Sequence, residues 1–268
     1  MLLRWFRKRR RRAILRQPFP EAWREIVARH LAPWARLDEG ERRRLEELTQ
    51  VFLAEKRWEG CGGLELTDDI RVTIAAQACL LLLNRDDEDY YPKMKTIFVY
   101  PHHYFAKQKH MGSGGIVTEG PSGRLGESWY RGPVVLSWDD AVHGAADHHD
   151  GHNVVFHEFA HQLDSESGQT NGAPVLDRKS QYVAWARVLG EEYGHLLEDV
   201  EHHRKPDIDP YGATNPAEFF AVITECFFEK PRKLQRKHPA LYDQLKSFYH
   251  QDPAQTLEAQ SSGDVHAC

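Results

Sequence analysis

The residues best placed to do chemistry lie in one short segment, Val154 to Asp164, which contains the pattern H-E-x-x-H. Residues four apart on an α-helix lie on one face, one turn apart, so His157 and His161 can direct two imidazoles at a single ion. Zinc accepts imidazole nitrogen at about 2.0–2.1 Å. Glu158 is displaced too far around the helix to be an equal ligand, but it is close enough to reach a water bound to the ion. This arrangement is the one that a metallopeptidase needs.

The residues around the pattern indicate a buried helix. Buried polar groups without partners are costly, so two histidines and a glutamate at such a place need a reason. A metal ion supplies one. The structural alternative is that the two histidines bond to backbone groups of the core and Glu158 forms an ion pair. The flanking apolar residues are Val154, Val155, Phe156, Phe159, Ala160 and Leu163.

A third ligand has to come from elsewhere in the chain, because a catalytic zinc usually has three protein ligands and one open position. Glu218 is the first candidate. Asn215 is a good N-cap and Pro216 a good first helical residue, which places Glu218 in the first turn of a helix. The helix dipole favours an acidic residue there even without a metal. Glu225 lies seven residues further on the same face and is the second choice, as a ligand or as a partner of one.

Two other polar features near the motif leave alternatives open. Asp164 lies three residues after His161, so it could orient a ligand histidine or cap the next turn. Segment 143–152 is an alternative metal site, although such residues in a loop are often only solvated. Its histidines and aspartates are His143, His148, His149, His152, Asp147 and Asp150.

The predicted elements around these groups form an α+β chain with a helical front, a small sheet in the middle and a helical back half. Residues 20–58 show a helical pattern in which Asp38 caps the second helix. Thr67 or Asp68 caps a third helix, from about 69 to 83. Further helices are predicted after Asp139 and at about 153–163, 178–198, 216–229 and 239–249.

Strands are predicted at 96–100 and 134–138, where β-branched and aromatic residues gather. The second strand has two interpretations. An extended peptide substrate could add to a free edge of it through main-chain hydrogen bonds, or it could be an ordinary core strand.

Composition and charge narrow the function classes. Of the 268 residues, 41% are hydrophobic, which is enough for a globular core, and the net charge is −5. No stretch approaches the ~18–20 apolar residues of a transmembrane segment. Nucleic acid is not an expected partner, because the chain is acidic overall and a structural zinc would normally have more cysteine ligands. The four cysteines form no CxxC pair, so a reducing, cytoplasmic location is expected.

Seven basic residues lie between Arg4 and Arg12. A secretory signal would continue with an apolar segment, and none follows, so export is not expected. The run is either a contact surface for anionic lipid or nucleic acid, or the solvated start of a helix.

Three segments together resemble the Mlc titration factor A family of bacterial zinc peptidases. The residues from Gly151 to Asp164 resemble its HExxH motif. The likeness covers roughly residues 15–255. The other two segments are Asp209-Pro210-Tyr211 with Asn215-Pro216-Ala217-Glu218-Phe219-Phe220, and Val134-Val135-Leu136-Ser137-Trp138-Asp139 upstream.

The resemblance implies a mostly helical zincin-like metallopeptidase domain of the gluzincin type, with a small mixed β-sheet and an HExxH active-site helix. Carried over, His157, His161 and Glu218 bind one Zn²⁺ per chain, and Glu158 is the general base. Tyr211 lies near the metal and stabilises the transition state. The resemblance also implies aminopeptidase-like activity on small peptides.

Some members of the family have a regulatory partner, the glucose repressor Mlc, and through it a role in glucose uptake. The rival prediction is a non-catalytic, zinc-containing regulator that binds a repressor protein. The expected organisation is a basic segment at 1–15, a single peptidase domain at 16–252 with a helical part at 16–60 packed on it, and a disordered tail at 253–268.

Overall fold

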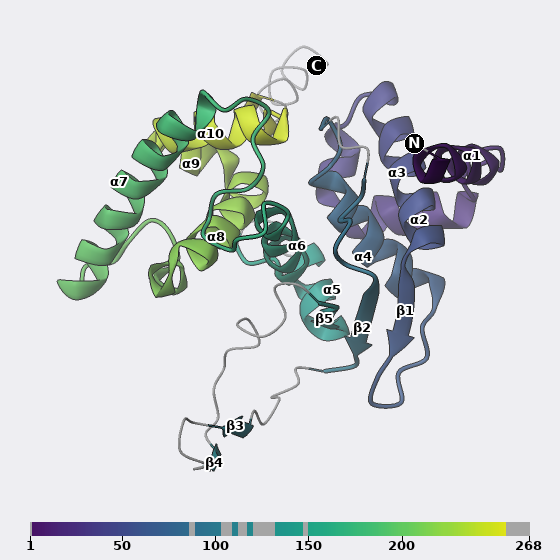
Figure 1. Ribbon diagram of the computed structural model, residues 1–268, viewed down its shortest axis with the longest axis horizontal. Coiled ribbons are helices and arrows are strands. Elements are labelled where there is room, and N and C mark those ends of the chain that lie inside the picture. Colours follow the sequence, from purple (N-terminus) through teal and green to yellow (C-terminus); the bar gives the residue numbers. More distant parts are fainter. Residues whose placement is uncertain are drawn as a thin grey trace, which may run out of the picture.

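The computed structural model describes residues 2–85, 89–102, 109–111, 117–119, 132–146 and 150–255. Helices dominate this part of the chain (Figure 1), so the predicted mostly helical α+β architecture is confirmed. The N-terminal helices are α1 (Leu2–Ile14), α2 (Glu21–His30), the short 3-10 helix η1 (Ala32–Arg36), α3 (Glu39–Glu55) and α4 (Asp68–Leu80). The later ones are α5 (Trp138–Ala146), α6 (Val154–Ser165), α7 (Gln181–Glu201), the 3-10 helix η2 (Pro210–Thr214), α8 (Pro216–Glu229), α9 (Pro231–Lys237) and α10 (Pro239–Tyr249).

The sheet is parallel rather than mixed. Its strands are β1 (Arg57–Gly60), β2 (Thr96–Tyr100) and β5 (Val134–Ser137), in the order β1-β2-β5, and both pairs are parallel. Among the described strands, antiparallel pairing occurs only in a separate pair, β3 (Lys109–Met111) with β4 (Val117–Glu119). A parallel neighbour requires a long crossover, and the segment that contains α4 provides it between β1 and β2.

Strand β1 corrects the prediction of helix through residue 58. Helix α3 ends at Glu55, and Arg57 and Trp58 pair with Thr96 and Ile97 of β2. The strand forms because of a tertiary contact. This short strand gains its main-chain hydrogen bonds only because β2 lies beside it, and the local apolar spacing carries no sign of a partner so far along the chain.

The predicted caps begin two of the N-terminal helices. Asp38 accepts a hydrogen bond from the backbone N–H of Glu41, whose carboxylate accepts one from the N–H of Asp38, a capping box at the start of α3. Thr67 accepts a hydrogen bond from Ile70 N at the start of α4. Local side-chain chemistry therefore sets where α3 and α4 begin, and loss of such a cap typically costs about 1 kcal/mol.

The core holds α6 from two sides. Figure 1 shows α6 between the N-terminal helices with their sheet and the group α7–α10. Helices α4 and α8, which both pack against α6, are buried along almost their whole lengths. On the N-terminal side, the ring of Phe159 lies 4.8 Å from that of Tyr91 and 5.8 Å from that of Phe52, measured between centroids. Interdigitated rings of this kind give a helix little freedom to shift.

No helix within the described ranges is both long and apolar enough to cross a bilayer. Of the predicted tail, residues 253–255 are described and the remainder lies outside the described residues. The division of the chain into a basic segment, a peptidase domain and a tail stays a prediction.

Glu229, at the end of α8, is a carboxyl group with only 5% of the residue exposed. Its two oxygens are enclosed, and Asn153 and the backbone N–H of Gly151 are the groups that favour its ionised form. Burial raises the pKa of this carboxyl from 4.5 to about 9, and the charges of Asp150 and Glu225 add to the rise. At neutral pH the folded protein therefore keeps Glu229 protonated, whereas the unfolded chain ionises it.

Glu229→Gln is expected to stabilise the protein increasingly as the pH rises. The folded state binds the proton more tightly, so the stability contributed by Glu229 is fully present below pH 4.5 and is lost as the pH rises toward 9. Glutamine does not titrate, so its advantage at pH 8 over pH 5 should be about 4 kcal/mol in the free energy of unfolding. Urea unfolding at both pH values measures this. The prediction would be contradicted if wild type and variant differed in the free energy of unfolding by the same amount at both pH values.

Candidate metal centre

Two helices meet at the predicted metal ligands, α6 with His157 and His161 and α8 with Glu218. The Nε2 atom of His157 lies 3.2 Å from that of His161 and 3.0 Å from Glu218 Oε2. The Nε2 atom of His161 lies 3.3 Å from the same oxygen. In the part of the chain that the structure describes, this is the one cluster of three such side chains close enough to hold a metal ion. The structure therefore brings the three predicted ligands to one point.

Each of these two helices begins at an asparagine. Asn153 Oδ1 accepts a hydrogen bond from Phe156 N at 3.0 Å and caps α6. Asn215 Oδ1 accepts from Ala217 N at 2.9 Å and from Glu218 N at 3.0 Å, which confirms the predicted cap of α8. The amide of Glu218 itself takes part in the cap, so the glutamate is held in the first turn, where the helix dipole favours its charge.

A second glutamate of α8 holds one of the histidines. Glu225 Oε1 lies 2.7 Å from His157 Nδ1, and Glu225 Oε2 accepts a hydrogen bond from Asn153 N at 2.5 Å. A carboxylate at Nδ1 fixes the tautomer and orientation of an imidazole, here with Nε2 facing His161 and Glu218. Of the two roles left open for Glu225, this geometry favours the partner of a ligand, and Glu225 is not a member of the three-residue cluster.

Sequence analysis does not identify two residues of this network. Asn153 Nδ2 donates hydrogen bonds to Gln77 Oε1 at 2.8 Å and to Gly144 O at 3.2 Å, which ties the start of α6 to α4 and α5. Both residues carry a signal in the sequence. Gln77 interrupts an apolar run, where a buried amide needs partners, and Asn153 stands directly before a helical pattern, where asparagine is a preferred cap.

The ionisable groups of the cluster shift one another's pKa. Burial by itself would lower the pKa of His157, but its hydrogen bonds to Glu218 and Glu225 raise it to about 10. Burial would raise the pKa of Glu218, yet the hydrogen bonds and charges of the two histidines hold it well below its usual range. Glu158 differs from Glu218, because burial outweighs the histidine charges and raises its pKa. The pKa values of Glu158 and Glu218 are thus shifted in opposite directions.

Glu158 and Tyr211 are the predicted residues that act on a substrate. Glu158 lies between the two histidines on α6, is half-buried, and stands outside the metal cluster. Tyr211 lies in η2, which packs against α8, and its ring centroid is 5.9 Å from that of His157. Tyr211 is 41% exposed and lines, with His157 and Glu225, a cavity of about 440 Å³. Tyr211 therefore lies beside His157 at a part of the site that is open to solvent.

Asp164 anchors the loop that follows α6. Its Oδ2 atom accepts a hydrogen bond from Gly172 N at 2.9 Å, and Gly172 O accepts one from the indole of Trp185 at 2.9 Å. Gly172 has φ +74°, and a Cβ there would lie 2.4 Å from Pro216 O, so only glycine fits. This contact reaches a backbone amide eight residues on, so it is not a cap of the next turn, and it fixes the loop against the start of α8.

The histidine-rich segment before α6 forms no second metal cluster within the described ranges. His143 Nδ1 lies 2.8 Å from Asp139 O, and His152 Nε2 lies 3.4 Å from Asp209 Oδ2. Both histidines are exposed. Asp150 Oδ1 accepts a hydrogen bond from His152 N at 2.8 Å, and the other three members, His148, His149 and Asp147, lie outside the described residues.

The fold and the site together define the class of protein. A mostly helical domain in which an HExxH helix meets a glutamate from a second helix is metallopeptidase-like. The chain belongs to the family described as glucose-regulated metallo-peptidase M90, whose model matches residues 4–250.

Curated relatives cover most of the chain. An uncharacterized protein of Synechocystis sp. is 42% identical over 245 residues, which are 91% of this chain and 89% of that protein. A protein named Mlc titration factor A from Klebsiella pneumoniae is 32% identical over 243 residues, 90% of this chain and 88% of that protein. Its namesake from Serratia proteamaculans is 33% identical over 235 residues, 85% of this chain and 88% of that protein. The resemblance to this family is confirmed.

Proposed function

We propose that this protein is a zinc-dependent peptidase that binds one zinc ion per chain through His157, His161 and Glu218. The observation that carries the proposal is the spacing of the three donor atoms, 3.0, 3.2 and 3.3 Å. Ligand atoms about 2.0–2.1 Å from a tetrahedral zinc lie about 3.3–3.4 Å from one another. The donors thus stand close to the positions that the ion requires. Two imidazoles and a carboxylate are also a typical ligand set of catalytic zinc, whereas structural zinc favours cysteine.

The proposed reaction is the hydrolysis of a peptide bond. When bound, zinc would lower the pKa of a water molecule toward about 7 and polarise the substrate carbonyl. Glu158 takes the proton from the attacking water and gives it to the leaving amine. Glu225 and Asn153 keep His157 in its orientation through the reaction.

Strand β5 supports an extended substrate. Among the described strands it pairs only with β2, so its second edge can receive the main chain of a peptide. Helix α6 packs against β5. This placement favours the substrate-platform interpretation of the strand, and the family resemblance supports small peptides and aminopeptidase-like action.

Hydrolysis of a substrate panel by the zinc-loaded protein tests the proposal. The panel pairs aminoacyl and short peptide substrates that have a free amine with the same peptides acetylated. Turnover of the free-amine members alone supports an aminopeptidase, and turnover of both supports an endopeptidase. If the protein holds one zinc per chain and hydrolyses neither set, the peptidase proposal fails.

Tyr211→Phe is expected to lower kcat by about 10²–10³-fold, because the hydroxyl donates a hydrogen bond to the oxyanion that develops on the substrate. KM and zinc affinity should change little, since the ring remains and the phenol is not a ligand. Steady-state kinetics on the best panel substrate measures this. Tyr193→Phe is the matched control, because the Tyr193 hydroxyl bonds to Ala213 O of η2 at 3.2 Å without facing the site. An equal loss in the control would mean that the position of η2, not the hydroxyl, matters.

The alternative function is a zinc-containing regulator that binds a repressor protein. The name of two of the relatives, Mlc titration factor A, favours it, and the matched family is described as glucose-regulated. A role in glucose uptake through the repressor Mlc is compatible with either function. If the protein is a non-catalytic regulator, its affinity for the repressor would be unchanged by Glu158→Gln.

A cytoplasmic location is also proposed, supported by the free thiols of Cys61, Cys79 and Cys226.

A further inference from the structure

Helix α1 is docked on the body of the protein by one face. The guanidinium of Arg11 donates two hydrogen bonds to the carboxylate of Glu55, at 2.8 and 2.6 Å, and stacks over the ring of Tyr90 at 4.1 Å. Arg7 forms an ion pair with Asp89. These contacts join α1 to the end of α3 and to the segment before β2. The basic run is therefore an ordered surface element with a defined inner and outer face.

The outer face of α1 combines exposed aromatic rings with arginines. Trp5 is 54% exposed and Phe6 57% exposed, and their ring centroids lie 5.0 Å apart. The guanidinium of Arg9 lies 5.5 Å from the centroid of the Trp5 ring. Arg9 and Arg12 are exposed and follow Trp5 at helical spacing, so they share its face, and the exposed Arg16 lies just beyond the end of α1. Two adjacent exposed aromatic rings have no role in holding the fold, which indicates a surface for a partner.

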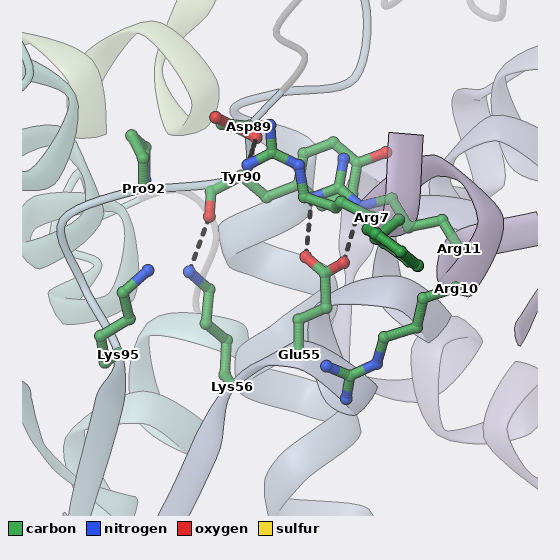
Figure 2. Close-up of a pocket in the computed structure, with 10 residues that line it drawn as sticks. Arg7, Arg10, Arg11, Glu55, Lys56, Asp89, Tyr90, Pro92 and Lys95 are labelled. Carbon is green, nitrogen blue, oxygen red and sulfur yellow. Dashed lines mark hydrogen bonds and ion pairs between the residues drawn. The ribbon is translucent and has the colours of Figure 1, made fainter. Parts of the chain in front are cut away.

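A cavity of about 450 Å³ opens beside this face, between α1, the end of α3 and the segment before β2. Five cationic side chains line it, from Arg7, Arg10, Arg11, Lys56 and Lys95, against two acidic ones. Figure 2 shows the amines of Lys56 and Lys95 beside each other, with that of Lys56 bonded to the backbone oxygen of Tyr90. The excess of positive charge favours an anionic group such as a phosphate.

We propose that α1 is a docking surface for membranes that contain anionic phospholipid. Tryptophan and phenylalanine are the side chains that enter the boundary between headgroups and acyl chains, so Trp5 and Phe6 insert there. The arginines of the outer face lie at the level of the headgroups, and the cationic cavity receives a headgroup phosphate. A phosphate backbone alone would account for the arginines but would leave the paired exposed aromatic rings without a role.

Membrane docking through α1 leaves the metal centre accessible. Figure 1 places α1 at one edge of the molecule, with α6 and α8 toward the middle and α7 at the opposite edge. A bilayer in contact with α1 would therefore hold the protein at the membrane without covering the cavity beside His157 and Tyr211. The inference does not depend on peptidase activity, because its residues are separate from the metal cluster.

Flotation of the full chain with lipid vesicles tests the proposal. Wild type should float with vesicles of phosphatidylcholine and phosphatidylglycerol mixed three to one, and not with phosphatidylcholine alone. Binding should fall steeply as salt is raised to about 0.5 M, which screens charges over a few ångströms. Trp5→Ser combined with Phe6→Ser should lower the partition coefficient about tenfold or more, since the buried apolar area is lost. Both residues are exposed, so circular dichroism should show the same fold and melting temperature.

A charge series separates α1 from charge in general. Arg9→Ala, Arg12→Ala and Arg16→Ala together should lower the partition coefficient about a hundredfold, at about fivefold for each arginine near an anionic surface. The matched control changes three exposed basic residues outside α1 to alanine, Arg178, Lys179 and Arg187, and it should bind like wild type. Absence of binding to the mixed vesicles would overturn the proposal. So would equal loss in the control, or duplex DNA binding as tight as vesicle binding that the aromatic double variant leaves unchanged.

Discussion

Glu158→Gln is expected to lower kcat for peptide hydrolysis by about 10²–10⁴-fold, the typical contribution of a positioned general base. Glutamine has the same shape as glutamate but cannot accept the proton of the attacking water. The side chain is half-buried beside the ligands, where burial raises the pKa of its carboxyl, and it is not a member of the metal cluster. The variant should therefore still bind one zinc per chain. Steady-state kinetics and metal analysis on the same sample measure both quantities.

The control for Glu158→Gln is Glu198→Gln, the same chemical change at an exposed position on α7. It should retain wild-type turnover. Two outcomes would remove Glu158 from its proposed role. If Glu158→Gln turned over peptides like wild type, another group would be the base. If it lost zinc together with activity, Glu158 would be acting as a ligand, and the three-residue cluster would be incomplete as described.

Glu218→Gln is expected to abolish tight zinc binding and, with it, all hydrolysis. The carboxylate is buried at 3% exposure and contacts both histidines through one oxygen. Removing its charge takes away one of three ligands and also the anion that balances the dication. The loss of affinity should therefore exceed the ~10–100-fold that loss of an outer partner of a ligand causes. Competition with a chromogenic chelator measures the dissociation constant.

A graded series of glutamine variants makes the expectation for Glu218 specific. Glu225→Gln should weaken zinc binding by about 10–100-fold, because Glu225 holds His157 Nδ1 and is not a ligand. Glu158→Gln should bind zinc like wild type. The expected order of affinities is thus wild type equal to Glu158→Gln, then Glu225→Gln, then Glu218→Gln. If Glu225→Gln lost more affinity than Glu218→Gln, the assignment of the third ligand would have to be exchanged between the two glutamates.

Zinc should also stabilise the fold through the same three residues. A ligand that binds only the native state adds about 4 kcal/mol at a thousandfold excess over its dissociation constant. The melting temperature of wild type should rise when zinc is added and fall when a chelator removes it. Glu218→Gln should melt at one temperature in both conditions. This readout does not require a substrate.

The amino-acid sequence by itself determined the features that arise from neighbours along one helix. The spacing of His157 and His161 places both on one face of any α-helix. Asn215 before a proline and an acidic residue predicts the start of α8, and the structure has the cap at that residue. The capping box at Asp38 follows the same logic. These interactions span three or four residues, so their geometry is contained in the local order of residue types.

Only the tertiary structure decided which distant groups complete the site. Glu218 and Glu225 share a helix face, and both lie more than 60 positions from His157. The sequence could rank the two glutamates as candidate ligands. Only the crossing of α6 and α8 places Glu218 against Nε2 of His157 and Glu225 against its Nδ1. Gln77 bonds to Asn153 across 76 positions for the same reason. The parallel pairing of β1 and the exposed rings of Trp5 and Phe6 likewise depend on what lies beside each segment, because partners in space are a property of the packed chain and not of its local pattern.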